Sequence, residues 1–453
     1  MMKKILWMLV TLMLLSGCSA VISQIDPQDG DYDFSFPDPQ DYAYSLNGST
    51  YISLGEEDVR IREGGTYILE GHLKGSIIVE VSKNEKVQLV LNNVEIEAGD
   101  FAGIYVIEAD EVIISLAEGS VNRISDDGTY TLIDSNTVDA LIFSKADLIM
   151  EGGGSLYLSS QYNHGIVSKD DLVIADGTYV IDVAGKAICG KDSVKILNGS
   201  FTIRSAKDAI VSDNDADEGK GYVYIAGGDF TIDATADGIY GYRLLRIDGG
   251  TFQITDSKAS TTDSYKALKS SGDIVLYGGN YQLKAADDGI HADGSIRITN
   301  GTYVITSSDD GIHADETVTI ENGTFQIEAS EGIEGTYIVI NDGIISIEAR
   351  DDGLNATRTS ASSKTAVEIN GGYITIVMGQ GDTDGIDANG YIYINGGTLD
   401  ITAQSPFDYD EGAEHNGGTI IVNGTETDEI VNQFQNGGPF GGMPGGGNDN
   451  GHH

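Results

Sequence analysis

The feature that most constrains the fold is a motif written twice in succession, AADDGIHADGSIRITNGTYVI and then SSDDGIHADETVTIENGTFQI. Its first glycine is Gly289 in one copy and Gly311 in the next, a step of 22 residues, and Gly332 and Gly353 follow at steps of 21. A period of this length, built from short β-type runs between Gly, Asn and Asp turns, is typical of a solenoid. After residue 20 the chain has no sustained helical period of apolar residues, which disfavours helical repeats.

The repeat therefore predicts an all-β chain folded as a single-stranded parallel β-helix. Each rung should contain about 22 residues in two or three short strands, and neighbouring rungs should lie about 4.8 Å apart. Because each rung of a solenoid contacts only its neighbours, 453 residues can form one long domain. The net charge of −45 argues against nucleic-acid binding, which needs a basic surface, and favours bound cations.

The chain divides into five segments by composition. Residues 1–18 read as a lipoprotein signal peptide, with basic MMKK, apolar ILWMLVTLMLL and LSGC, which resembles a lipobox ending in Cys18. Residues 19–47 read as an acidic tether, 48–139 as an N-terminal cap with irregular rungs, 140–424 as the regular β-helix, and 425–453 as a Gly-rich disordered tail. We expect an extracellular protein anchored to the membrane by lipid at Cys18; an uncleaved anchor or a plain secretion signal is the alternative.

Alternation within the strands separates an inner face from an outer face. An aromatic residue and an aliphatic residue two positions later recur at each rung, as in Tyr303 and Ile305, or Phe325 and Ile327. We assign this aromatic column to the interior, because its partner position is always aliphatic. Cys189, the one cysteine beyond the signal, should pack as a small apolar residue.

An outward column four residues before each turn glycine is basic and aromatic. Cations are scarce in this chain, yet they cluster here with tyrosines, and such a face can stack a pyranose ring and pair with its carboxylate. The alternative is a solvated sheet face with incidental charges. The candidate substrate-binding residues are Lys195, Tyr222, Tyr224, Arg246, Arg297, Tyr391 and Tyr393.

A second column, at the DDG corner, is acidic. Like charges about 5 Å apart repel by roughly 3 kcal/mol per pair at an effective dielectric of 20, so the column must be solvated, protonated or bridged. Ca²⁺ takes clusters of carboxylate oxygens, whereas the alternative is that each Asp caps a turn without metal. We place Ca²⁺ between rungs around Asp288, Asp293, Asp310 and Asp315, and treat His291 and His313 as turn or surface residues, since zinc would want more His or Cys. The full set of candidate metal ligands is Asp208, Asp213, Asp237, Asp288, Asp293, Asp310, Asp315, Glu331 and Asp352.

Several segments resemble a known family. GTYILEG, KVQLVLNNVEI, ALIFSKADLIMEGGGSLYL, GIVSKDDLVIADGTYVI, GKDSVKILNGSFTI and SDNDADEGKGYVYIAGGDFTI are similar to clostridial-type carbohydrate-binding proteins. That resemblance implies an extracellular right-handed parallel β-helix that binds calcium, is similar in shape to pectate lyases, and binds cellulose-like or acidic plant polysaccharide. It also implies calcium or turn roles for Asp170, Asp192, Asp213 and Asp215. Lys186 and Lys266 replace the repeat's Asp, so a calcium column should be interrupted there.

Three functions remain open on the sequence alone. The first is a surface-anchored, monomeric protein that binds polysaccharide with calcium in its acidic turns. The second is a calcium-dependent, pectate-type polysaccharide lyase, in which Lys186, Lys207 or Lys266 would act as the base. The third is an envelope adhesin or structural β-helix without a sugar ligand. Nucleotide or serine-nucleophile chemistry has little support, because the sequence holds no P-loop and no G-x-S-x-G turn.

Overall fold

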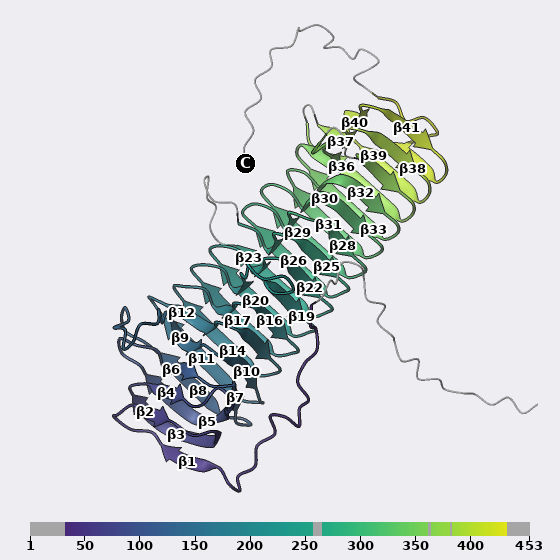
Figure 1. The fold of residues 1–453 in the computed structure, drawn as a ribbon. Coiled ribbons are helices and arrows are strands. Elements are labelled where there is room, and N and C mark those ends of the chain that lie inside the picture. The colour runs from purple at the N-terminus through teal and green to yellow at the C-terminus, as the bar shows by residue number, and fades with distance from the viewer. Residues whose placement is uncertain (1–31, 257–264, 361–363, 381–382, 433–453) are drawn as a thin grey trace, which may run out of the picture.

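The computed structural model describes residues 32–256, 265–360, 364–380 and 383–432. This part of the chain is built from strands, and it contains no helix long and apolar enough to cross a membrane. Figure 1 shows the strands following one another along one long axis, from β1 near the N-terminus to β41 near the C-terminus. The signal peptide predicted over residues 1–18, with Cys18, lies outside the described residues.

Nearly every strand pairs in parallel with the strand one turn further along, which gives three stacks. Stack 1 holds the long strands that follow the turn glycines: β8 (Val121–Ser125), β11 (Ser155–Ser160), β14 (Thr178–Val183), β17 (Ser200–Ser205), β20 (Asp229–Ala234), β23 (Thr251–Asp256), β26 (Asn280–Ala285), β29 (Thr302–Ser307), β31 (Thr324–Ala329), β33 (Ile344–Ala349), β36 (Tyr373–Met378), β39 (Thr398–Thr402) and β42 (Thr419–Val422). Stack 2 follows the acidic corner: β2 (Val59–Ile61), β4 (Ile77–Glu80), β6 (Ile104–Glu108), β9 (Ala140–Ser144), β12 (His164–Ser168), β15 (Ile188–Gly190), β18 (Ile210–Ser212), β21 (Ile239–Gly241), β24 (Leu268–Ser270), β27 (Ile290–Ala292), β34 (Asp352–Ala356), β37 (Asp384–Ala388) and β40 (Ser405–Tyr409).

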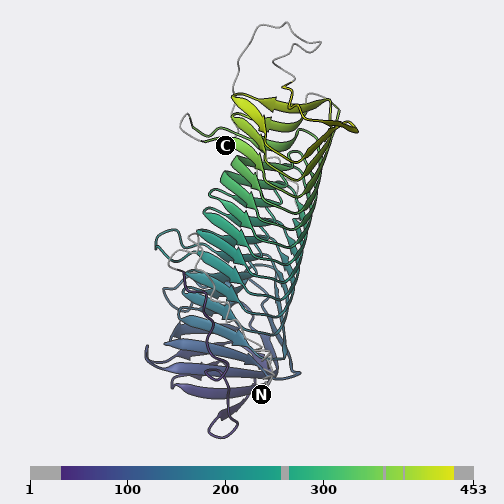
Figure 2. The same cartoon turned by 90° about the vertical axis from the view of Figure 1, so that its right-hand side faces the viewer.

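Stack 3 closes each turn. It holds β1 (Thr50–Ser53), β7 (Glu111–Leu116), β10 (Asp147–Glu151), β13 (Asp171–Ile174), β16 (Ser193–Ile196), β19 (Tyr222–Ile225), β22 (Leu244–Ile247), β25 (Asp273–Leu276), β28 (Ile296–Ile298), β35 (Ala366–Ile369), β38 (Tyr391–Ile394) and β41 (Gly412–His415). Four longer strands bend across a corner: β3 (Gly65–Lys74) and β5 (Lys86–Glu97) belong to stacks 3 and 1, and β30 (Ile312–Ile320) and β32 (Ile333–Ile340) to stacks 2 and 3. This arrangement is the coiled solenoid that the repeat predicts (Figure 2). The right-handed sense and the 22-residue rung stay predictions.

The interior holds the predicted aromatic column. Phe201, Phe230 and Phe252 are at most 2% exposed, and their rings stack in near-parallel planes 4.6 and 4.8 Å apart. Tyr281 and Tyr303 continue the column at 4.6 Å. Parallel pairing in register places identical positions directly above one another, so the aromatic rings of successive rungs meet face to face. The assignment of this column to the core is confirmed.

The first described segment, residues 32–44, does not extend away from the solenoid as the tether prediction has it. Tyr32, Phe34 and Phe36 alternate along it, and these side chains pack against Tyr222 and Tyr224 on stack 3. Further along, Tyr42 packs against the outer side of stack 3 on earlier rungs and its carbonyl accepts a hydrogen bond from Gln88. We call residues 32–44 the strap; Figure 1 shows it in dark purple beside the coil. Its aromatic period of two lets one side of an extended chain bury apolar surface.

The boundary of the C-terminal tail also differs from the sequence-based division. The predicted tail begins at residue 425, but β43 (Thr425–Thr427) pairs antiparallel with β42, and Asn432 donates hydrogen bonds to Asp408 and the carbonyl of Tyr409. Phe101, from the connection between β5 and β6, and Tyr130, from the connection between β8 and β9, cover the apolar outer face of early stack 2. Cys189 is 8% exposed within that cluster, as expected of a small apolar residue.

Candidate functional site

Stack 3 carries the predicted basic-aromatic column on its outer side. The register joins Lys195 to Tyr224 and Tyr224 to Arg246, and then runs through Val275 to Arg297. A second column runs beside it, two residues earlier on each strand, and begins at Tyr222. On later rungs Tyr337 and Tyr391 lie in this second column and Tyr393 lies in the first. The predicted alignment of these positions is therefore correct, but the two halves of the face have different surroundings.

The strap covers the half nearer the N-terminus. Tyr222 and Tyr224 are 4% and 7% exposed, and Lys195 is 6% exposed. The Tyr222 hydroxyl donates to the carbonyl of Asp33 at 2.7 Å, and the Lys195 ammonium donates to the carbonyl of Ser35 at 3.0 Å. The expectation of an open basic-aromatic surface is wrong for this half in the structure described, because the chain's own aromatic segment occupies it.

Arg246 lies at the centre of the covered half. Its guanidinium is 4.4 Å from the ring centre of Phe34 and 4.7 Å from that of Tyr277, and its Nε donates to Asp248 at 2.8 Å. A guanidinium held between aromatic faces and a carboxylate is well satisfied, since both contacts compensate its lost hydration. In this structure Arg246 anchors the strap.

The half nearer the C-terminus lies beyond the strap. Tyr391 and Tyr393 project from the same side of β38, with ring centres 5.5 Å apart and planes only 11° from parallel. Tyr337 lies two rungs earlier in the column of Tyr391. The Lys364 ammonium lies 4.6 Å from the ring centre of Tyr337, and the Tyr337 hydroxyl donates to Glu368. These tyrosines are half-buried, so they are fixed by neighbours yet reachable. The open half is thus a rigid aromatic surface rimmed by charges.

The acidic column lies at the corner between stacks 1 and 2, and it is a true vertical stack. One oxygen of Asp237 accepts from the backbone N–H of Lys266, one of Asp288 from that of Asp310, and one of Asp352 from that of Asp384, each at 3.0 Å. Each carboxylate therefore caps the corresponding backbone group of the next rung. This capping role was the alternative to metal binding, and it accounts for one oxygen of each of these side chains.

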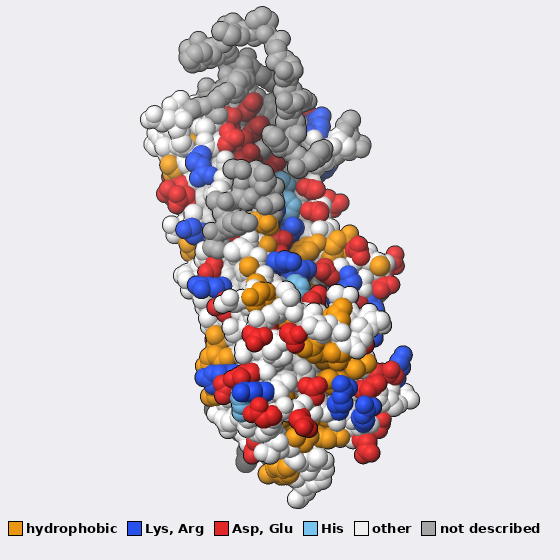
Figure 3. Space-filling model, turned by 90° about the vertical axis from the view of Figure 1, so that its left-hand side faces the viewer, with side chains coloured by type: hydrophobic (Ala, Val, Ile, Leu, Met, Phe, Trp, Pro, Cys, Tyr) orange, Lys and Arg blue, Asp and Glu red, His pale blue; other side chains and the backbone are white. Residues whose placement is uncertain are grey.

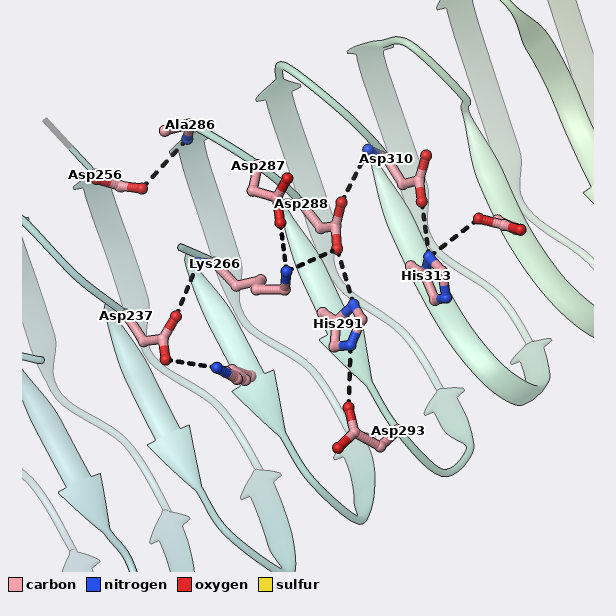
Figure 4. Close-up of polar contacts among 12 residues, drawn as sticks. Asp237, Asp256, Lys266, Ala286, Asp287, Asp288, His291, Asp293, Asp310 and His313 are labelled. Atoms are coloured by element: carbon pink, nitrogen blue, oxygen red, sulfur yellow. Dashed lines mark hydrogen bonds and ion pairs between the residues drawn. The ribbon is translucent and has the colours of Figure 1, made fainter. Parts of the chain in front are cut away.

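Protein cations balance the middle of the column (Figure 4). Lys266, which stands in the Asp position, pairs with Asp287 and lies 3.4 Å from Asp288. Lys269 pairs with Asp237 at 3.0 Å. Three rungs earlier, Lys186 pairs with Asp213 at 2.9 Å and lies 3.6 Å from Asp208. Lys186 and Lys266 thus place ammonium groups within the acidic column, at the positions where the sequence predicts that a calcium column is interrupted.

His291 and His313 belong to this network rather than to turns, which the sequence interpretation missed. His291 lies 2.8 Å from Asp288 through Nδ1 and 3.1 Å from Asp293 through Nε2. The equivalent contacts of His313 are 2.7 Å to Asp310 and 3.3 Å to Asp315. The signal was present in the repeat itself, because a histidine stands three residues after the corner Asp in both copies of DDGIHAD.

These contacts set the protonation of the network. Burial alone would lower the pKa of His313, but its hydrogen bonds to Asp310 and Glu334 outweigh burial and raise that pKa to about 11. Burial raises the pKa of Asp310 to about 9, and repulsion from Asp288 and Glu334 adds to this rise. The hydrogen bond from His313 acts in the opposite direction but is outweighed. At neutral pH the imidazole of His313 is therefore charged. Burial would raise the pKa of Glu334, but the hydrogen bond from His313 outweighs burial and lowers that pKa, so Asp310 is the carboxyl group of this pair that holds a proton more readily.

Beyond His313 the column is dominated by carboxylates. Burial, followed by repulsion from Glu334, raises the pKa of Glu331 to about 8. Burial and neighbouring aspartates likewise raise the pKa of Asp352 to about 7 and that of Asp387 to about 6. Carboxyl groups in this range are partly protonated near neutral pH, so this end of the column gains from any cation that displaces the protons. Acidic side chains are interspersed with basic ones and histidines over the face seen in Figure 3.

The donor atoms decide which positions suit calcium. Asp147, Asp170 and Asp171 bring three carboxylate oxygens within 4.8 Å of one another, and repulsion from the other two adds to burial in raising the pKa of Asp147 to about 6. An oxygen-only set of this kind fits a hard cation such as Ca²⁺. The predicted position Asp288 belongs to a second oxygen-only group, with Asp287 and Asp309. Asp288 and Asp310 are each also hydrogen-bonded to an imidazole nitrogen.

The lysines proposed as a lyase base have different surroundings. Burial would lower the pKa of Lys266, but Asp288 and Asp287 outweigh it and raise the pKa; Asp213 does the same for Lys186. A general base must lose its proton near the working pH, so these two ammonium groups are poor candidates. Lys207 is exposed.

Two of the comparisons with known proteins give the same family description. The family described as carbohydrate-binding domain-containing protein matches residues 55–311 and 304–428. A protein of that description from Acetivibrio thermocellus is 30% identical over 254 residues, which are 54% of this chain and 88% of the relative. A solved structure of a polysaccharide lyase-like protein from C. thermocellum, a gadolinium derivative, is 27% identical with a TM-score of 0.47 and covers 50% of this chain and 96% of its own. On the extent of the family match, this chain belongs to the carbohydrate-binding domain-containing protein family.

Proposed function

We propose that this protein binds polysaccharide along the open half of stack 3. Membership of the family supports a carbohydrate-binding role. The observation that carries the choice of surface is the pair Tyr391 and Tyr393, whose rings lie in nearly parallel planes, 5.5 Å apart on one strand.

Rigid tyrosines suit sugar binding for a physical reason. A pyranose has apolar C–H faces and a polar rim, and a tyrosine offers an apolar ring with a hydroxyl at its edge. Because Tyr391 and Tyr393 are fixed on a paired strand, little side-chain entropy is lost when a sugar stacks on them. Lys364 and Arg297, on the same side of the solenoid, can pair with carboxylates of an acidic sugar.

We infer a plant cell-wall type of ligand, either cellulose-like or acidic and pectin-like, with Ca²⁺ in the acidic turns. A chain of net charge −45 repels an anionic glycan unless cations bridge the two, and Ca²⁺ coordinates carboxylates of both partners. The oxygen-only group formed by Asp147, Asp170 and Asp171 supports calcium binding. The protein would act as a monomer at the cell surface, held by a lipid on Cys18; a Cys18→Ser variant should then leave the membrane fraction.

Affinity electrophoresis in gels containing cellulose derivatives or polygalacturonate tests the proposed surface. Replacing both Tyr391 and Tyr393 by Ala should reduce retardation roughly tenfold or more, since each lost stacking contact is worth about 1 kcal/mol or somewhat more. Tyr373 is the matched control, because it is a 48% exposed tyrosine on stack 1, away from the proposed face. Equal binding by the double variant and by Tyr373→Ala would refute this surface.

Calcium is tested separately in the same gels. Chelation with EDTA should abolish retardation by polygalacturonate and leave retardation by a neutral glucan intact, because only the anionic glycan needs the bridging ion. Retardation by polygalacturonate that is unchanged by EDTA would remove calcium from the mechanism without affecting the tyrosine surface.

A further inference from the structure

The outer column of stack 2 changes character along the solenoid. It is apolar at Val211 and aromatic at Tyr240, and then becomes Lys269, His291, His313 and Glu334 on successive rungs. Parallel pairing fixes these side chains one above another beside the acidic corner. The metal-ligating residue types therefore gather on neighbouring rungs, away from the tyrosine surface on stack 3.

On the earlier rungs of this region, lysine ammonium groups pair with the carboxylates. Lys269 pairs with Asp237, and Lys266 lies 3.4 Å from Asp288. On the following rung, the ion pairs found within the described ranges join Asp310 and Glu334 to one group, the imidazole of His313. Asp310 is only 4% exposed, so bulk water contributes little to its solvation. This rung holds two carboxylates with at most one positive charge between them.

The three side chains converge on one point. Nδ1 of His313 lies 2.7 Å from Oδ2 of Asp310 and 3.0 Å from Oε2 of Glu334. A histidine nitrogen carries at most one hydrogen, so it cannot satisfy two carboxylates fully. Asp310 and His313 come from the corner before β30 and from β30 itself, and Glu334 comes from the adjacent, hydrogen-bonded β32. The donors are thus held by two paired strands.

The spacing of these donor atoms is close to the spacing of the ligands around a small, tetrahedrally coordinated metal ion. Zn²⁺ binds imidazole nitrogen and carboxylate oxygen at about 2.0–2.2 Å, which separates neighbouring donors by roughly 3.3 Å. The observed separations of 2.7 and 3.0 Å need to widen by only a few tenths of an ångström, within reach of side-chain rotation. An imidazole in the set favours Zn²⁺ and its first-row neighbours over Ca²⁺, which prefers six to eight oxygens.

We propose that Asp310, His313 and Glu334 bind a divalent transition-metal ion such as Zn²⁺, distinct from the calcium proposed for the oxygen-only turns. The ion would replace the shared proton of this rung and tie β30 to β32. The proposal does not rest on glycan binding, and it holds whether or not the tyrosine surface is correct.

Isothermal titration of the metal-stripped, untagged protein with ZnCl₂ at neutral pH tests this site. We expect one tight site that His313→Ala weakens roughly tenfold or more and that Glu334→Gln, which keeps the side-chain shape, also weakens. The control is His72→Ala, because His72 forms an exposed pair with Glu97 at the other end of the solenoid. The terminal His452 and His453 are present in every variant, so any binding there cancels in the comparison.

Co²⁺ provides a second readout, since ligation by His313 should give visible d–d absorption that His313→Ala abolishes. Far-UV circular dichroism of the metal-free variants establishes that the solenoid is retained. Zinc affinity that is the same in wild type, His313→Ala and Glu334→Gln would overturn the proposal. So would the absence of Zn²⁺ binding, or a site that takes Ca²⁺ and Zn²⁺ with equal affinity.

Discussion

Replacement of Asp352 by Asn should stabilise the protein at alkaline pH. Asp352 accepts the backbone N–H of Asp384 through one oxygen at 3.0 Å, while burial and the charges of Asp387, Asp384 and Asp351 raise its pKa to about 7. Asn keeps an oxygen for that hydrogen bond and has no proton to lose. The substitution therefore removes the titration and preserves the cap.

The sign follows from proton binding. The pKa of Asp352 is higher in the folded than in the unfolded chain, so folding takes up a proton between these values, and the stability from the protonated form is lost as pH rises through about 7. A shift of about 3 units corresponds to roughly 4 kcal/mol as an upper bound. Because the side chain is only half-buried, solvent screening reduces this to about 1–2 kcal/mol.

The assay is thermal or denaturant unfolding at pH 5 and pH 8. At pH 8 Asp352→Asn should be more stable than wild type by about 1–2 kcal/mol, and at pH 5, which lies between the unfolded and folded pKa values, by about a third of that. Millimolar Ca²⁺ at pH 8 should stabilise wild type more than the variant, if a cation replaces the proton. Asp352→Ala, which also removes the titration but loses the capping oxygen, is the control and should be less stable than Asp352→Asn at both pH values. An Asn variant that is less stable at pH 8 would refute the reasoning, because it would mean that the folded state prefers the carboxylate.

Two further substitutions test the network and the strap. Lys266→Ala should cost about 1–3 kcal/mol in unfolding experiments, because the 3% exposed carboxylate of Asp288 loses its ammonium partner and keeps His291, at 2.8 Å; an unchanged midpoint would show that the ion pair is not needed. Phe34→Ala should raise hydrogen exchange of residues 32–44 and leave the solenoid's unfolding midpoint within about 1 kcal/mol, because Phe34 is half-buried and its contacts with Arg246 and Tyr224 hold the strap and no rung. Coincident loss of strap and solenoid would contradict this.

The sequence determined the periodic part of this protein. Strand pairing in a solenoid repeats one local register, so the spacing of Gly289 and Gly311 was enough to predict parallel stacking, a buried aromatic column and an acidic column broken at Lys186 and Lys266. The same logic aligned Tyr391 with Tyr222, several rungs apart in the fold, without any knowledge of coordinates.

What only the tertiary structure decided is which of these aligned positions remain open and what balances their charge. The strap lies about 160 residues from Lys195 in sequence. The repeat period does not predict that Tyr32, Phe34 and Phe36 cover Tyr222. Likewise, the hydrogen bond between His313 and Glu334 depends on the rotation of two side chains across adjacent strands. A repeat fixes columns because backbone hydrogen bonds are local from rung to rung, whereas contacts between side chains and non-repeating segments have no period from which they can be read.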